Sequence, residues 1–504
     1  MNEPNVLIPN KNETPSNLAY RYSQLAAAEK HAQIKQQLGQ FFTPPETALF
    51  MAGFMDLGQI PEIINILEPG VGTAILACSF IEEIIKNNKI IEINLDCYEI
   101  DLSIIPYTTC VLEYLKEWLN KQNIVLTYNL VIEDYIVYNK SVFEGIYNGV
   151  LYDFIISNPP FFKLPNNDER VKIASQILHG LPNIYSIFFY ISTLILKKEG
   201  KLLYLIPRSF CSGSFFKLIR NNYLKNIKIN KIHLFSSDEK IFDSHSVVYE
   251  FVIVECQKNI EELNNYNINI THANNIHSVK NVDYDRNFNT GENIIELPAC
   301  EEDLSILNKI HSWTGSLKKY GCNILHGKLI ITACEKYIYN KEGENLVPLL
   351  WLPNIETGKF NYPLPLNYGQ YLLADAKTEK YILENKNYVL LRRYNNNDYT
   401  KRIISTPYLN KYLNSKNIAI ERLISCIYKN ECELSNEEVI GISAILNSRF
   451  INSYLRMING IINVTAEMIL NIPLPDINII KDIGRRIING DINDDCEGDR
   501  FINW

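Results

Sequence analysis

The stretch IINILEPGVGT, at residues 63–73, decides the fold of this chain. An apolar segment, Ile63–Leu67, is followed directly by Glu68-Pro69-Gly70-Val71-Gly72-Thr73 and then by an apolar helix. Glycines at the carboxyl end of a first parallel strand let the backbone approach a bound ligand closely. The third glycine of the dinucleotide-binding pattern is absent, and a tight strand-to-helix turn also explains the motif. Its interpretation therefore depends on the neighbouring segments.

Strands and helices alternate on both sides of this stretch. Predicted strands lie at residues 63–67, 90–98, 124–131, 151–157, 201–207, 227–235 and 247–255, and predicted helices at 74–86, 103–119, 184–198 and 215–224. Alternation at this spacing predicts an α/β, Rossmann-like fold with a mostly parallel sheet and helices on both faces. The last two strands have no helix-length gap between them, which predicts that one of them is antiparallel.

The length of 504 residues predicts two or three domains. We expect an N-terminal helical arm at 1–35, an α/β domain at 36–257, an asparagine-rich linker or surface excursion at 258–296, and a separate α+β domain at 297–504.

Composition sets limits on function. The 11 cysteines are scattered, without a CxxC pair, so we expect reduced thiols and no metal site. No apolar run reaches membrane-spanning length and the N-terminus is polar, which predicts a cytoplasmic protein with no membrane partner. The net charge of −8 argues mildly against nucleic-acid binding, although charge can be segregated along a chain.

Carboxylates follow the next two strands. Glu99, in Tyr98-Glu99-Ile100-Asp101, is placed to accept both hydrogen bonds from a ribose diol. After the third strand, Asp134 is placed to accept from an adenine amino group and Tyr135 to cover the ring. Each acid alone has a second explanation as a solvated loop charge. With Glu68, three acids at three successive strand ends indicate a site for an adenine nucleoside.

A helix start precedes the glycine stretch. In Gln40-Phe41-Phe42-Thr43-Pro44-Pro45-Glu46, the spacing of Thr43 and Glu46 predicts a capping box, and Pro44 suits the first helical position. Its place just upstream of the glycines predicts that this turn closes over the other end of the ligand.

The fourth strand ends at Ser157-Asn158-Pro159-Pro160-Phe161. Two prolines donate no backbone hydrogen bonds and hold the chain extended, so the carbonyls stay free to accept. Asn158 adds a side-chain acceptor and Phe161 a flat face. An aromatic amine needs two acceptors and a stacking surface, so the motif predicts an amine site, with a structural Asn-Pro-Pro turn as the alternative.

In their order, these motifs resemble the γ-class adenine-N6 DNA methyltransferases, the TaqI-like and Eco57I-like modification enzymes. The resemblance covers residues 36–256. It also includes Asn183-Ile184-Tyr185, Gly200-Lys201-Leu202 and Ile241-Phe242-Asp243-Ser244-His245-Ser246-Val247. One departure is Phe161, where tyrosine is commoner, so stacking is retained but a hydroxyl contact is lost.

The resemblance implies a site-specific adenine-N6 methyltransferase that uses S-adenosylmethionine and rotates its target adenine out of the duplex. Asn158, Pro159 and Pro160 would hold the N6 amine, and Phe161 and Phe242 would stack on the ring. The implied cofactor-binding residues are Thr43, Glu68, Pro69, Gly70, Gly72, Glu99, Ile100, Asp134, Tyr135 and Asn158.

The region 297–504 carries the densest basic cluster, Arg392 and Arg393 with Lys401 and Arg402, interleaved with tyrosines. It predicts contact with double-stranded DNA, and a solvated charged strand is the alternative. The segments 325–328, 446–448 and 471–475 resemble, more loosely, the target-recognition region of Eco57I-like enzymes.

Other functions use similar turns. Methyltransferases that act on protein glutamine or on RNA amines share this kind of motif but have small extra domains. A catalytically inactive fold that only binds DNA is disfavoured by the intact Asn158 and cofactor acids. Residues 1–40 are too few for a nuclease domain. We therefore expect a monomeric, stand-alone modification enzyme with a separate cognate restriction endonuclease.

Overall fold

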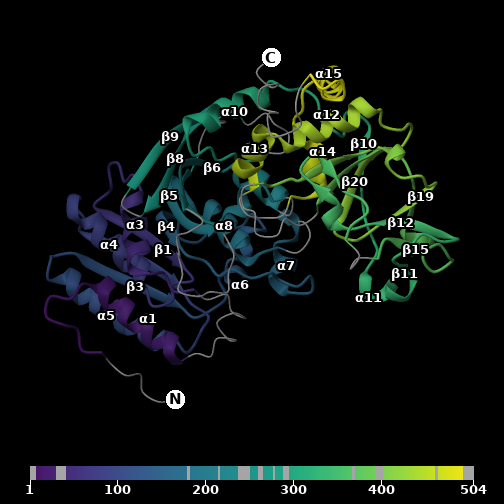
Figure 1. Ribbon diagram of the computed structural model, residues 1–504. Coiled ribbons are helices and arrows are strands. Elements are labelled where there is room, and N and C mark those ends of the chain that lie inside the picture. Colours follow the sequence, from purple (N-terminus) through teal and green to yellow (C-terminus); the bar gives the residue numbers. More distant parts are fainter. Residues whose placement is uncertain are drawn as a thin grey trace. The chain divides into compact units, whose positions relative to one another are not determined.

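The structure is a computed structural model that describes residues 7–29, 41–178, 182–213, 216–235, 250–258, 265–275, 278–287, 294–365, 369–392, 401–459 and 464–491. It divides into two compact units, Met1–Ala299 and Cys300–Trp504 (Figure 1). Within the described residues, no helix is both long and apolar enough to cross a membrane. Each unit is described by itself.

A nine-stranded sheet in the order β3-β2-β1-β4-β5-β7-β6-β8-β9 forms the centre of the first unit. Its strands are β1 (Ile63–Pro69), β2 (Glu92–Tyr98), β3 (Val125–Val131), β4 (Tyr152–Ser157), β5 (Leu196–Pro207), β6 (Ile227–Phe235), β7 (Phe251–Lys258), β8 (Asn265–Asn275) and β9 (Ser278–Asn287). From β3 to β5 the pairing is parallel, whereas β7 is antiparallel to both β5 and β6. This confirms the mostly parallel Rossmann-like sheet and the expected antiparallel strand.

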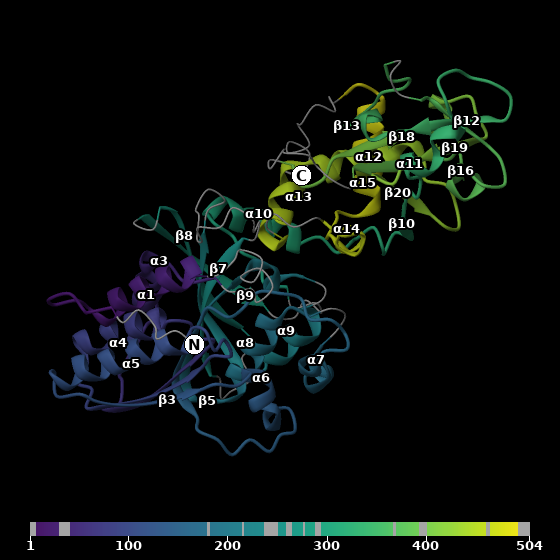
Figure 2. The same ribbon diagram turned by 90° about the horizontal axis from the view of Figure 1, so that it is seen from below.

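Helices lie on both faces of this sheet. They are α1 (Pro15–Glu29), α3 (Pro45–Phe54), α4 (Ile75–Asn87), α5 (Ile105–Asn120), α6 (Tyr135–Tyr138), α7 (Glu169–Ile173), α8 (Ile184–Leu194) and α9 (Lys217–Tyr223). Figure 2 shows α4 and α5 on one side of the sheet and α8 and α9 on the other. Both faces of β1 and β4 are therefore covered, which explains why these strands are almost continuously apolar.

The N-terminal helix α1 packs onto α4 and α5. Leu18 and Tyr22 are buried in this contact, and Ser16 donates from its backbone N and its Oγ to the Glu82 carboxylate of α4, each at 2.7 Å. The described part of the N-terminal arm is thus an integral layer of the first unit.

Two expectations about this unit were wrong. Residues 258–296, expected as a linker or a surface excursion, contribute β8 and β9 to the sheet. Ile268 and Ile270 alternate with polar residues and are buried, so only one face of β8 is apolar and the asparagines obscure the period. The helix α8, expected to reach Lys198, ends at Leu194. The reason is that Leu196 already belongs to β5, where it pairs with Tyr152 of β4.

The second unit is α+β. Its strands form sheets in the orders β10-β20-β17-β18, β11-β15-β12-β19-β16 and β13-β14. They are β10 (Cys322–His326), β11 (Ile338–Tyr339), β12 (Leu346–Leu350), β13 (Ile355–Glu356), β14 (Lys359–Phe360), β15 (Tyr371–Leu373), β16 (Ile382–Glu384), β17 (Tyr388–Arg392), β18 (Ser405–Tyr408), β19 (Asn417–Ile420) and β20 (Ile424–Lys429). The helices are α10 (Glu301–His311), α11 (Ile331–Cys334), α12 (Asn436–Asn447), α13 (Arg449–Asn459), α14 (Ala466–Asn471) and α15 (Ile477–Ile488).

Two glycines bring α12 and α15 into close contact. A Cβ on Gly441 would lie 2.0 Å from the Ile480 carbonyl oxygen, and one on Gly484 would lie 2.0 Å from the Glu437 carbonyl oxygen. Neither space can hold a side chain, so each helix presents bare backbone to the other. Ser435 and Glu438 form a capping box at the start of α12, which fixes where the helix begins.

Candidate active site

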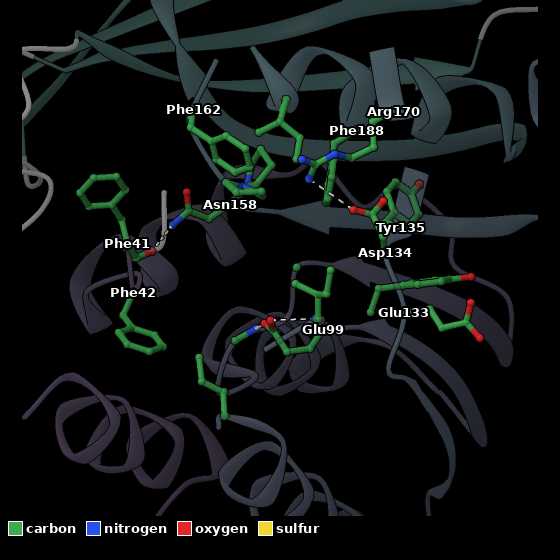
Figure 3. A pocket seen from close by; sticks show the side chains of 18 residues that line it. Phe41, Phe42, Glu99, Glu133, Asp134, Tyr135, Asn158, Phe162, Arg170 and Phe188 are labelled. Carbon is green, nitrogen blue, oxygen red and sulfur yellow. Dashed lines mark hydrogen bonds and ion pairs between the residues drawn. The ribbon is translucent and has the colours of Figure 1, made fainter. Parts of the chain in front are cut away.

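A pocket lies at the carboxyl ends of β1, β2, β3 and β4 (Figure 3). It measures about 860 Å³ when the space open to solvent is included, a size that suits a small-molecule ligand. Open α/β sheets bind ligands at this edge, where the order of the strands reverses. The residues that line it are Phe41, Phe42, Gly70, Gly72, Tyr98, Glu99, Ile100, Ile104, Glu133, Asp134, Tyr135, Asn158, Pro159, Pro160, Phe162, Arg170, Ile184 and Phe188.

The glycine loop after β1 forms the floor of this pocket. Gly70 and Gly72 have φ angles of 75° and 52°, in the left-handed region that favours glycine. The backbone N–H groups of Gly70 and Val71 both donate to the Tyr98 carbonyl at 2.9 Å, which ties the loop to the end of β2. The backbone of this loop can therefore approach a bound ligand closely, as the sequence predicts.

The Glu99 carboxylate stabilises the same loop by accepting hydrogen bonds. Its Oε2 accepts from Gly72 N at 3.0 Å, and its Oε1 accepts from Ile100 N and Asp101 N at 3.0 and 2.9 Å. Burial raises the pKa of Glu99, and the bonds from these backbone N–H groups partly offset that effect. A carboxylate has about four acceptor positions, so these bonds leave Oε2 able to accept from a ligand. The predicted position of Glu99 beside the glycines is confirmed.

Two predicted cofactor residues of the loop do not line this pocket. Glu68 is buried, and its Oε2 accepts from Ala77 N in α4 at 2.8 Å. Burial raises its pKa well above the usual range of a glutamate. The carbonyl of Pro69 accepts from Ser157 Oγ at 2.7 Å. In the structure, both residues join the loop to its neighbouring elements.

Asp134 and Tyr135, at the end of β3, do line the pocket. Asp134 caps α6: its Oδ1 accepts from Ile136 N and Val137 N at 2.9 and 3.1 Å. Tyr135 is buried, and its ring lies 4.9 Å from the ring of Phe188 on α8. The two rings form an apolar wall beside a carboxylate, the surroundings that a purine with an amino group requires.

Asn158 is held between the pocket and the segment before α3. Its Nδ2 donates to the Phe41 carbonyl and to Thr43 Oγ1, both at 3.0 Å, and these acceptors fix which way the amide faces. Its Oδ1 is buried, and no hydrogen-bond donor among the residues described here reaches it. A buried acceptor without a donor costs free energy unless a ligand supplies one.

The predicted capping box at Thr43 was wrong. The helix α3 begins at Pro45, its N-cap is Pro44, and no side chain caps it. Pro45 occupies the first helical position, and the Thr43 hydroxyl instead contacts Asn158. Thr43 is buried and does not line the pocket. Its contact holds the Asn158 amide.

The aromatic residues of the motif occupy different surroundings. Phe162 lines the pocket, whereas Phe161 lies in a buried cluster, with ring centroids 5.1 Å from Phe251, 6.0 Å from Tyr185 and 6.3 Å from Phe41. Phe242 lies outside the described residues.

Sequence reasoning missed several lining residues, above all Phe188 and Arg170. Phe188 was hidden because α8 is buried on nearly every side, so its sequence marks no single face as facing a pocket. For Arg170 the available signal was Asp168 two residues earlier, a helix N-cap within reach of the arginine.

The basic cluster of the second unit is partly engaged in its own fold. Arg392 Nε donates to the Ile355 carbonyl at 2.7 Å, and Lys401 Nζ donates to Thr357 Oγ1 at 3.0 Å. Both contacts reach the β13–β14 hairpin. Arg402 is half-buried, and Arg393 lies outside the described residues. The structure therefore gives Arg392 and Lys401 a stabilising role besides any contact with DNA.

Comparisons with known proteins agree with a methyltransferase. Residues 79–242 match the family model described as Eco57I restriction-modification methylase. The type II methyltransferase M.BsuBI of Bacillus subtilis is 24% identical over 90% of this chain and 91% of its own length. M.PstI of Providencia stuartii is also 24% identical, over 93% of both chains. The solved structure of the type IIL restriction-modification enzyme MmeI in complex with DNA shares the fold, with a TM-score of 0.56 and 11% identity over 96% of this chain and 75% of that one.

The sheet, the glycine loop and the carboxylates at successive strand ends define a Rossmann-like methyltransferase that uses S-adenosylmethionine. More closely, the chain is similar to the methyltransferases of restriction-modification systems, which supports a γ-class methyltransferase that acts on DNA. Methyltransferases of RNA or of protein glutamine are not favoured.

Proposed function

We propose that this methyltransferase transfers a methyl group to the N6 amine of adenine at a specific site in duplex DNA. The observation that carries the proposal is the buried Asn158 Oδ1, an acceptor without a described donor, at the end of β4. An exocyclic amine supplies the missing donor. Because N6 is stacked and paired inside the duplex, the adenine must be rotated out to reach this oxygen.

Asn158 and Pro159 hold the amine in this proposal. Asn158 Oδ1 accepts one N–H, and the Pro159 carbonyl accepts the other. With both hydrogens held, the nitrogen lone pair turns out of conjugation with the ring and faces the methyl donor. Positioning supplies most of the rate enhancement, and no covalent enzyme intermediate is needed. Phe161 and Phe242 remain the proposed stacking residues.

The pocket suits S-adenosylmethionine, which supplies a methyl group on a sulfonium when bound. Glu99 is proposed to accept from the ribose hydroxyls and Asp134 from the adenine amino group. Tyr135 and Phe188 form the wall against the adenine ring, and Gly70 and Gly72 keep the floor free of side chains. Thr43, Glu68 and Pro69 would act by holding Asn158 and the loop in place.

We also propose the setting of the reaction: a monomer in the cytoplasm of a bacterium or archaeon, paired with a separate restriction endonuclease for the same site. The separate endonuclease is supported by the relatives, since the chain matches 91% of M.BsuBI and 93% of M.PstI, both named as methyltransferases.

A product assay tests the proposal. The purified chain is incubated with S-adenosylmethionine labelled on its methyl group and mixed-sequence duplex DNA, and the nucleosides are then separated by mass spectrometry. We expect labelled N6-methyladenine at a single sequence context. Labelled N4-methylcytosine would contradict the choice of adenine while keeping amine transfer, and labelled C5-methylcytosine would contradict the role of Asn158 altogether.

A further inference from the structure

Arg170 is a cationic residue in a pocket whose other charged lining residues, Glu99, Glu133 and Asp134, are acidic. It lies at the start of α7, in the segment between the Asn-Pro-Pro-Phe motif and α8. The base of this segment is closed, because Leu164 N donates to the Pro182 carbonyl at 2.9 Å and Ile184 N donates to the Phe162 carbonyl at 3.0 Å. The segment therefore leaves the active site and returns to it at fixed points.

The Arg170 guanidinium is fixed by its neighbour Asp168. Its Nε and one terminal nitrogen donate to the two carboxylate oxygens of Asp168 at 2.8 and 2.6 Å, a bidentate pair. Arg170 holds the pKa of the Asp168 carboxyl below its usual range, so this pair is charged at neutral pH. Asp168 also caps α7 by accepting from Arg170 N at 2.9 Å. The arginine is thus preorganised before any ligand binds.

The remaining face of the Arg170 guanidinium is directed at Asp134 and Phe162, which line the pocket. Its other terminal nitrogen lies 3.4 Å from Asp134 Oδ2, and its Cζ lies 5.6 Å from the centre of the Phe162 ring (Figure 3). Asp134 Oδ1 is already occupied by the cap of α6, so Oδ2 is the oxygen available to a ligand. Arg170 and Asp134 are 21% and 18% exposed, which limits screening of the pair by water.

We infer that Arg170 is a positioning residue that keeps Asp134 Oδ2 aimed at the adenine amino group of the cofactor, and so sets the selectivity of the pocket for adenine. The inference rests on the proposed function, because it deepens the role proposed there for Asp134. Arg170 does not touch the cofactor in this account. It acts through the carboxylate, and its contact with Phe162 joins that carboxylate to the loop that follows Asn158.

A pair of ligands isolates this role. S-adenosylhomocysteine carries the adenine amino group, and S-inosylhomocysteine has a carbonyl in its place. The ratio of their dissociation constants, from calorimetric titration, measures recognition of the amino group. In the wild type we expect a ratio of at least about tenfold, the value of one hydrogen bond to a charged group. A general loss of structure would weaken both ligands equally and leave the ratio unchanged.

Four variants are compared. Arg170→Ala should lower the ratio severalfold, and Arg170→Lys should restore part of it, since a lysine keeps the charge without the bidentate geometry. Asp134→Asn should remove the preference, so that the two ligands have equal dissociation constants. Lys172→Ala, an exposed change on the same short helix, should leave it at the wild-type value.

The outcomes separate the two claims. If Asp134→Asn leaves the ratio unchanged, the role of Asp134 under the proposed function fails, and this inference fails with it. If Asp134→Asn removes the preference for S-adenosylhomocysteine but Arg170→Ala leaves the ratio unchanged or raises it, only the inference about Arg170 is overturned. A raised ratio would mean that Arg170 competes with the adenine for Oδ2.

Discussion

At the scale of single residues, Asn158 has two functions on one amide. Its Nδ2 holds the segment before α3, and its Oδ1 is directed to the proposed amine. Replacing Asn158 with alanine removes a contact that matters in the transition state, so kcat should fall more than about tenfold, or about 1.4 kcal/mol of barrier. Single-turnover methylation assays measure this fall, and calorimetry with S-adenosylhomocysteine should show nearly unchanged affinity.

Thr43→Val is the matched control for that variant. It removes one acceptor of the Asn158 amide but keeps the shape of the side chain at position 43 and the contact of Asn158 with the Phe41 carbonyl. The loss of kcat should therefore be smaller than in Asn158→Ala. If Asn158→Ala retains more than a tenth of the wild-type kcat, or if Thr43→Val loses as much as Asn158→Ala, the amide oxygen is not the amine acceptor.

Glu99 gives a second prediction at this scale. Glu99→Gln keeps the size of the side chain but loses an acceptor toward Gly72 N or the ribose hydroxyls, so affinity for S-adenosylhomocysteine should fall about tenfold or more. The exposed Glu133, which lines the same pocket, serves as the control. Titration calorimetry that showed equal affinities for Glu99→Gln and Glu133→Gln would remove Glu99 from the ribose site.

The pH dependence of cofactor binding follows from the same residue. Burial raises the pKa of Glu99, so on acidification its carboxylate is protonated at a higher pH than that of a free glutamate. The protonated form loses acceptor capacity, and affinity for S-adenosylhomocysteine should therefore weaken as the pH falls through this raised pKa. In Glu99→Gln this weakening should disappear; a wild-type affinity that stays constant under mild acid would contradict the prediction.

At the scale of elements, the contact between α12 and α15 depends on glycine. Gly441→Ala places a methyl group 2.0 Å from the Ile480 carbonyl oxygen, and only a shift of the helices relieves it. We expect a loss of about 1–3 kcal/mol of stability, typical of overpacking, measured by denaturant unfolding of the second unit. Gly53→Ala on α3, where nothing lies within 4 Å, should be neutral or slightly stabilising. Equal stability of the two variants would contradict the close packing.

Elements also show how far the sequence could predict this structure. The strands from β1 to β4 and the polar residues at their carboxyl ends were predictable, because a buried parallel sheet makes apolar runs and the chemistry lies where each run ends. The strands β8 and β9 were not, since their asparagines mask the alternation of Ile268 and Ile270. Arg170 and Phe188 were missed because contact with the pocket comes from tertiary folding, and neither residue follows a strand.

At the scale of the whole molecule, a net charge of −8 requires that DNA contact be local. The cluster of Arg392, Arg393, Lys401 and Arg402 remains the proposed phosphate contact, although Arg392 and Lys401 also hold the β13–β14 hairpin. This dual role changes how the cluster must be tested, because a loss of DNA affinity on replacing Arg392 can come from the hairpin alone.

Salt dependence distinguishes these causes. If Arg392 and Arg393 contact phosphates, replacing both with alanine should weaken binding to cognate and random duplexes alike and flatten the slope of log K against log salt by about 0.9 for each lost contact. Arg392→Lys keeps the charge but loses the Nε bond to Ile355, so it should lower stability while largely preserving the slope. A loss confined to the cognate duplex, of about 1–3 kcal/mol, would instead mean that an arginine reads a guanine edge. An unchanged slope and affinity in the double variant would leave the cluster as a solvated face, and recognition would then have to come from other residues of the second unit.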